Sequence, residues 1–183
     1  MKSIRIFREN GTVKFEEVTV VKTDTVFFIN DDNEKHWPTI VADEIGPSDT
    51  SSEAPAPAQP YGCRIDGHTE VGSVERVEPL ARVNITLPQA TNGQPITEQQ
   101  LVSGGKSPYT PSNALFEVRD STGTTIDSGP GIGPGLQLIP KGQNKGVFVG
   151  GTPALSGTYH FVFTVDDKIL QNLQQVRFSM KVV

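Results

Sequence analysis

The strongest constraint on the fold is an alternation of apolar and polar residues at every second position. It is clearest near the C-terminus, in 158–165 and again in 176–182. A spacing of two places these apolar side chains on one face of an extended strand, whereas a helix needs a spacing of three or four. The chain also has 18 glycines and 14 prolines, which divide it into short segments. We therefore predict an all-β chain of short strands and turns, as in β-sandwiches.

Earlier segments follow the same period. The alternation in 13–20 changes phase at Glu16-Glu17, which indicates a bulge or bend. Residues 26–29 are apolar at every position, as in a strand buried on both faces. His160 alternates with apolar neighbours and is expected to face solvent. Further strands are expected at Ile4–Ile6, Leu80–Leu87, Ala114–Val118 and Val147–Val149, with one helical turn near Lys168–Asn172.

The length favours two domains. A chain of 183 residues is too long for one small sandwich. Residues 42–60 are acidic, rich in Pro, Ala and Ser, and predict a mobile loop. We predict β-sandwich domains at residues 1–79 and 80–183, joined near Val74–Leu80.

Composition excludes several classes of partner. The net charge is -5 and no basic run is present, which argues against nucleic acid and anionic membranes. No apolar run approaches the ~20 residues of a spanning helix. The first ten residues lack the apolar region of a signal peptide, so either the chain is intracellular or a leader has been removed. A single cysteine permits no intramolecular disulfide.

The stretch from Asp24 to Ile40 carries the first candidate for chemistry. Its apolar run ends at Asn30, and a polar turn leads to His36, one of three histidines. A histidine just past the end of a strand is held rigidly near the surface, as a metal ligand must be. The alternative is a turn residue without a special role.

Residues Ile4–Ile40 resemble the opening of the cupredoxins, the small blue-copper sandwiches. The matching pieces are IRIF, ENG and VKFEEVTVVKTDTVFFINDD, followed by His36. Farther on, Cys63 and His68 have the Cys-x4-His spacing of azurin-like sites. The resemblance implies a cupredoxin-like Greek-key sandwich that binds copper, with His36, Cys63 and His68 as equatorial ligands. It also implies a periplasmic or extracellular location.

The family's axial methionine has no counterpart here, because no Met follows His68. Glu70 or a backbone carbonyl would take its place, and the reduction potential would be lower than at a Met-ligated site.

Two imidazoles and one thiolate are a donor set that suits copper. Zinc would accept the same atoms with a carboxylate or water as the fourth ligand. The carboxylates nearest in sequence are Asp31, Asp32, Asp66 and Glu70. The alternative is that Cys63 is a buried apolar residue and His68 lies in a polar turn.

From about Ile85 to the end, the chain resembles an Ig-like domain repeated in bacterial surface proteins. The matching pieces are LPQATNGQP, SGGKSPYT, PGLQL and GGTPALSGTYHFVFTVDD, in the family's order. The resemblance implies an Ig-like Greek-key sandwich that acts as a spacer or in adhesion and assembly, without chemistry of its own.

Two functions are therefore expected. The first is copper binding for electron transfer or copper handling, with a redox protein as partner. The second is a metal-free structural protein, in which the two sandwiches contact copies of the chain, as a homo-oligomer or larger assembly, and residues 42–60 contact the partner. An enzyme is not expected, because a Cys63–histidine pair has no third orienting group in the sequence.

Overall fold

The computed structural model describes all 183 residues, which form 16 β-strands and no helix. The all-β prediction is confirmed. The helical turn expected near Lys168–Asn172 is wrong: these residues form a tight turn between two strands. The chain contains no helix with the length and apolar character needed to cross a bilayer. It divides into two compact units, Met1–Glu78 and Pro79–Val183, which are called the N-terminal and C-terminal units below and are described separately.

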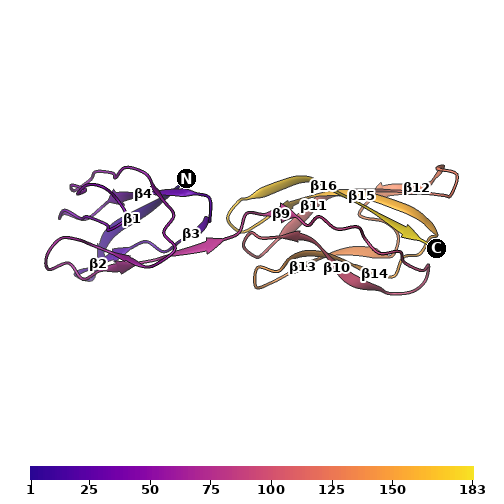
Figure 1. Cartoon of the computed structure of the whole chain (residues 1–183), viewed down its shortest axis with the longest axis horizontal. Coiled ribbons are helices and arrows are strands. Elements are labelled where there is room, and N and C mark those ends of the chain that lie inside the picture. Colours follow the sequence, from indigo (N-terminus) through magenta and orange to yellow (C-terminus); the bar gives the residue numbers. More distant parts are fainter. The chain divides into compact units, whose positions relative to one another are not determined.

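The N-terminal unit is built around one four-stranded sheet with the order β2-β1-β4-β5 (Figure 1). In this sheet β1 pairs with β2 in antiparallel and with β4 in parallel orientation. Two small sheets, β3-β8 and β6-β7, complete the unit. Its strands are β1 (Lys2–Glu9), β2 (Thr12–Phe15), β3 (Val18–Val21), β4 (Thr25–Asn30), β5 (Ala54–Pro55), β6 (Tyr61–Gly62), β7 (Val71–Gly72) and β8 (Val74–Val77).

The core of the N-terminal unit lies on one face of the main sheet. Phe15, Phe28 and Tyr61 pack edge to face, with ring centroids 5.1–5.9 Å apart. Val26 and Phe28 are fully buried, but Phe27 and Ile29 are only half-buried, so β4 is not buried equally on both faces as expected. The cause is that β4 faces the main core on one side only.

Of the two alternatives expected at Glu16-Glu17, the bend is found and not the bulge, because the chain leaves β2 in one sheet there and enters β3 in another. One other expectation for this unit needs correction. Residues 42–60 are irregular, yet they are attached to the unit, because β5 pairs with β4 and Thr50 bridges Ile29. Apolar side chains from 41–56 enter the core, namely Val41, Ile45, Ala54 and Ala56.

The C-terminal unit is a β-sandwich of two four-stranded sheets. One has the order β13-β14-β10-β9 and the other β12-β11-β15-β16. Figure 1 shows β10, β13 and β14 in one layer and β11, β15 and β16 in the other. Its strands are β9 (Ala81–Arg82), β10 (Ile96–Ser103), β11 (Thr110–Arg119), β12 (Thr125–Pro130), β13 (Leu136–Lys141), β14 (Gly146–Gly151), β15 (Gly157–Asp166) and β16 (Asn172–Val182).

The period of two sets the core of this sandwich. In β15 and β16 every second side chain is apolar and buried, and the side chains between them are less buried or exposed. The buried ones pack against buried residues of β10 and β14, such as Leu101 and Val149. His160 is exposed, as expected. The strand expected at Leu80–Leu87 reduces to β9, and most of that segment is irregular. The Gly- and Pro-rich segment 128–135 begins inside β12 and continues as an irregular connection to β13.

A buried carboxylate organises the turn between β15 and β16. Asp167 accepts hydrogen bonds of 2.8–3.0 Å from the backbone N–H groups of Lys106, Ile169 and Gln171. Gly105 packs against it with φ +69°, and a Cβ there would lie 2.7 Å from the Asp167 carboxylate. The contact therefore joins this turn to the loop before β11.

Candidate metal centre

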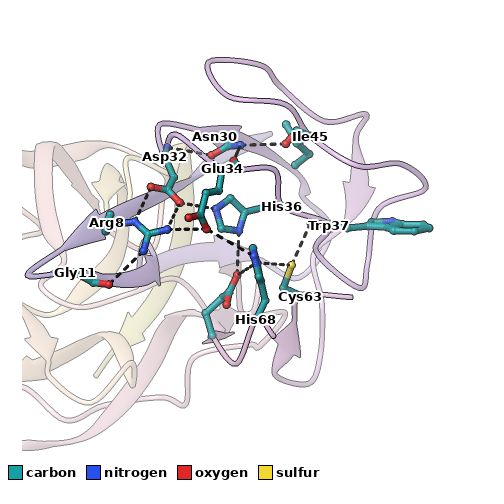
Figure 2. Close-up of polar contacts among 11 residues, drawn as sticks. Arg8, Gly11, Asn30, Asp32, Glu34, His36, Trp37, Ile45, Cys63 and His68 are labelled. Atoms are coloured by element: carbon teal, nitrogen blue, oxygen red, sulfur yellow. Dashed lines mark hydrogen bonds and ion pairs between the residues drawn. The ribbon is translucent and has the colours of Figure 1, made fainter. Parts of the chain in front are cut away.

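The first component of the site is the turn that delivers His36. Asn30, fully buried at the end of β4, donates to the carbonyl groups of Glu34 (2.7 Å) and Ile45 (3.0 Å). Its side-chain oxygen accepts from the Asp32 N–H at 3.0 Å. These three bonds, shown in Figure 2, fold residues 30–36 back on themselves and fix the direction of His36.

Cys63 reaches the site by strand-like pairing. The segment after His36 runs antiparallel to 62–64, because Thr39 N–H bonds to the Gly62 carbonyl and Arg64 N–H to the Trp37 carbonyl, both at 2.9 Å. The Trp37 N–H also donates to Cys63 Sγ at 3.2 Å. The 26 residues between His36 and Cys63 therefore form a closed loop whose ends are neighbours.

A tight turn brings the second imidazole back to the thiol. His68 N–H bonds to the Ile65 carbonyl at 3.1 Å, and Gly67 adopts φ +85°. Nδ1 of His68 lies 3.4 Å from Cys63 Sγ. The His36 and His68 rings are 4.9 Å apart between centroids.

Four side chains converge: His36, Cys63, His68 and Glu70, with one donor atom from each within 4.8 Å of the others. Oε1 of Glu70 lies 2.9 Å from His36 Nδ1 and 3.0 Å from His68 Nδ1. Ligand atoms around one tetrahedral ion lie roughly 3.3–3.8 Å apart, because the metal bonds are about 2.0–2.3 Å long. The donor set and its spacing therefore fit a single small ion after minor side-chain shifts.

The burial of the cluster is uneven. The side chains of His36 and Glu70 are 0% and 6% exposed, whereas His68 is 16% exposed. His68 and Glu70 line a cavity of about 470 Å³, together with Glu34 and Arg8. The site is thus closed on the His36 side and reachable from solvent on the His68 side.

Charges on the closed side are paired. Arg8 hydrogen-bonds both oxygens of Asp32, and this holds the pKa of Asp32 far below its usual range although burial opposes the shift. Burial would raise the pKa of Glu70. The hydrogen bonds from its own backbone N–H and from His36, with the charge of His68, lower it overall. Both carboxyl groups are therefore anions and can balance a cation.

The structure brings His36, Cys63 and His68 together, as the sequence analysis expected. Of the four carboxylates nearest to them in the sequence, only Glu70 lies in the same cluster. Asp32 contacts Nε2 of His36, the ring nitrogen that faces away from Cys63 and Glu70, and Asp31 pairs with Arg5 at 2.8 Å. Asp66 is exposed in the turn. Arg8 was missed, because nothing in 2–9 except its charge distinguishes it.

Neither methionine supplies an axial ligand. Met180 is in the C-terminal core, and Met1 is the chain terminus, whose amino group lies 3.3 Å from Asp24. The third histidine, His160, is in the C-terminal unit and lies 2.8 Å from the Ser179 hydroxyl.

Comparisons with known proteins give no family. No family model matches the chain, and no curated protein matches it. The solved structures it is similar to include a blue copper oxidase from Nitrosomonas europaea, at 11% identity and TM-score 0.28, covering 99% of this chain and 85% of that one. A multicopper oxidase gives 11% identity and TM-score 0.27, covering 100% and 88%. A multi-copper oxidase from Pseudomonas thermotolerans gives 10% and 0.25, covering 100% and 68%.

TM-scores this low do not establish a common fold. The cupredoxin-like and Ig-like assignments of the two units therefore stay predictions, and the candidate metal centre depends on the geometry of this chain alone.

Proposed function

We propose that the N-terminal unit binds one copper ion through His36, Cys63 and His68, with Glu70 as the fourth donor. The observation that carries the proposal is the convergence of these four side chains from two separate segments, the turn that ends at His36 and residues 63–70. The spacing in the sequence predicts three of them as ligands, and the fold brings two imidazoles and the chain's one thiol to the same place.

The donor set favours copper among the common metals. Thiolate and imidazole ligands suit copper and zinc, whereas magnesium, calcium and manganese prefer oxygen ligands. Among first-row divalent ions copper binds most tightly to a given set of such ligands. Zinc is the closest competitor, because a carboxylate completes its usual tetrahedron.

One-electron transfer or copper handling is the role that follows. The ligand His36 is fully buried and hydrogen-bonded, so the site can keep its geometry when the copper changes oxidation state. Partly exposed His68 offers a route for the electron or the ion. A carboxylate in place of a thioether favours Cu(II), so a low reduction potential is expected. The proposal includes no substrate and no catalysis.

The test is titration of the purified chain with Cu(II). We expect one ion per chain and an intense visible thiolate-to-copper absorption band, which Cys63→Ser abolishes. His160→Ala is the matched control and should leave the band unchanged, because His160 belongs to the other unit.

A colourless protein that binds no metal would overturn the proposal. Binding with no band, and a preference for zinc in competition, would retain the metal site and exclude its use in electron transfer.

For the C-terminal unit we propose a structural role. Its one buried charged side chain, Asp167, is bound by neighbouring N–H groups and stabilises a turn. If the whole chain stays colourless with copper and light scattering shows large polymers, a structural role for both units becomes the better proposal.

A further inference from the structure

We propose that Asp32, clamped by Arg8, is the positioning residue that makes His36 a metal ligand, and that Glu34 has no such role for His68. This inference rests on the proposed metal site. It concerns the outer nitrogens of the two imidazoles, the ones that face away from Cys63 and Glu70.

The contact between His36 and Asp32 is short and buried. Nε2 of His36 lies 2.9 Å from Oδ2 of Asp32, and the two side chains are 0% and 2% exposed. Arg8 donates from Nε to one Asp32 oxygen at 3.0 Å and from Nη2 to the other at 2.9 Å. A carboxylate held at both oxygens cannot rotate away, so the direction of the His36 ring is fixed (Figure 2).

This arrangement determines which nitrogen faces the ion. In the metal-free chain Nδ1 of His36 hydrogen-bonds Glu70 at 2.9 Å. When Nε2–H donates to Asp32 and a metal ion displaces the proton from Nδ1, the lone pair on Nδ1 points toward the donor atoms of Glu70, His68 and Cys63. A carboxylate behind a metal-bound histidine fixes the tautomer and makes the imidazole a stronger donor. Asp32 is therefore expected to strengthen metal binding without touching the metal.

Glu34 lies on the corresponding side of His68, but the contact is longer and exposed to solvent. Glu34 pairs with the same Arg8 group at 2.9 Å, yet its carboxylate lies 3.8 Å from Nε2 of His68 and is 55% exposed. That separation is beyond hydrogen-bond reach, and exposed ion pairs contribute little. One guanidinium therefore contacts two carboxylates, of which only the buried one can orient a ligand.

Asp32→Asn and Glu34→Gln form a matched pair for the test. Each keeps the side-chain size and removes one negative charge next to Arg8. We expect Asp32→Asn to weaken Zn(II) affinity, measured by competition with a chromophoric chelator, by about 10–100-fold. Glu34→Gln should change it by less than about fivefold. The copper form of Asp32→Asn should also have a more positive reduction potential, because a weaker imidazole donor stabilises Cu(II) less.

A second measurement uses the wild-type chain and needs no variant to fold. In the zinc-loaded protein, ¹⁵N NMR should show His36 protonated at Nε2 and metal-bound at Nδ1. Binding through Nε2, or equal loss of affinity in Asp32→Asn and Glu34→Gln, would overturn the inference and leave the metal site standing. Failure of the wild-type chain to bind Zn(II) or copper would overturn the site and the inference together.

Discussion

At the scale of single residues, Glu70 distinguishes this centre from a site with a thioether ligand. Its oxygen lies within 3.0 Å of both inner imidazole nitrogens. We expect Glu70→Met to keep the thiolate-to-copper band, because the other three donors remain, and to raise the reduction potential, because a thioether favours Cu(I) more than a carboxylate does. Spectroelectrochemistry of the copper-loaded variant measures both. A lower or unchanged potential would show that Glu70 is not a ligand.

A second residue-scale prediction concerns a buried hydroxyl. Tyr61 is 2% exposed, its hydroxyl has no hydrogen-bond partner, and burial raises its pKa. Removing a buried, unpaired polar group removes its desolvation cost, so Tyr61→Phe should raise the free energy of unfolding by about 1 kcal/mol. Urea denaturation measures the change.

Tyr159→Phe is the control for Tyr61→Phe. The Tyr159 hydroxyl is hydrogen-bonded to the backbone N–H and carbonyl of Leu155, at 3.0 and 3.1 Å. Its loss should cost about 1 kcal/mol. If both variants are destabilised alike, the Tyr61 hydroxyl has a partner such as a buried water.

At the scale of elements, the turn after β15 depends on the absence of a side chain at Gly105. A Cβ there would lie 2.7 Å from the Asp167 carboxylate and 2.9 Å from Leu80. We expect Gly105→Ala to destabilise the C-terminal unit by more than about 1 kcal/mol. Gly123→Ala is the control, because Gly123 also has a positive φ, +86°, but open space around it. Thermal unfolding that is equal in the two variants would mean that the turn adjusts without cost.

The end of β4 shows how one strand can fix the position of a candidate ligand, because Asn30 there holds the turn that leads to His36. Asn30→Ala removes three hydrogen bonds that fold the turn leading to His36. The Glu34 carbonyl and the Asp32 N–H lose the partner that Asn30 supplies, whereas the Ile45 carbonyl keeps its bond from the His36 N–H at 3.1 Å. We expect a loss of about 1–3 kcal/mol in the stability of the N-terminal unit. Metal affinity should fall as well, because the ligand is no longer held in place. Normal affinity in a folded Asn30→Ala chain would show that the pairing of Trp37 with Cys63 is sufficient to place His36.

At the scale of the whole molecule, the two units have separate cores, so metal binding should stabilise only one of them. The single tryptophan, Trp37, is in the N-terminal unit, and its fluorescence reports that unit alone. Zn(II) at 100 times its dissociation constant should raise the unfolding free energy seen by fluorescence by about 2.7 kcal/mol. Cys63→Ser should show a much smaller effect. An equal shift in both units would contradict a site confined to the first.

The net charge is also divided unevenly between the two units. Residues 1–78 contain eight Lys and Arg against 15 Asp and Glu, a net charge of -7, and residues 79–183 contain eight against six, a net charge of +2. An acidic unit attracts cationic partners at low salt. Electron exchange of the copper form should therefore be faster with a cationic redox complex than with an anionic one, and the difference should shrink as ionic strength rises. Stopped-flow kinetics at two salt concentrations provides the measurement.

The all-β class, the inward faces of β15 and β16, and three of the four side chains that converge in the candidate site were predictable from the sequence, because alternation and residue type are local properties. It did not reveal that residues 42–60 enter the core, nor that the break at Glu16-Glu17 is a change of sheet. Both depend on which strands pair, and pairing joins residues far apart in the chain.

The three-dimensional arrangement places Glu70, and not Asp32, next to the thiol and both imidazoles, and it places Arg8 of β1 on the Asp32 carboxylate that contacts His36. Distance along the sequence does not distinguish among the four nearby carboxylates, Asp31, Asp32, Asp66 and Glu70. Their roles separate only when β1 and β4 lie side by side and the turns at 31–36 and 64–70 meet, because hydrogen-bond and metal-ligand distances are fixed by position in space.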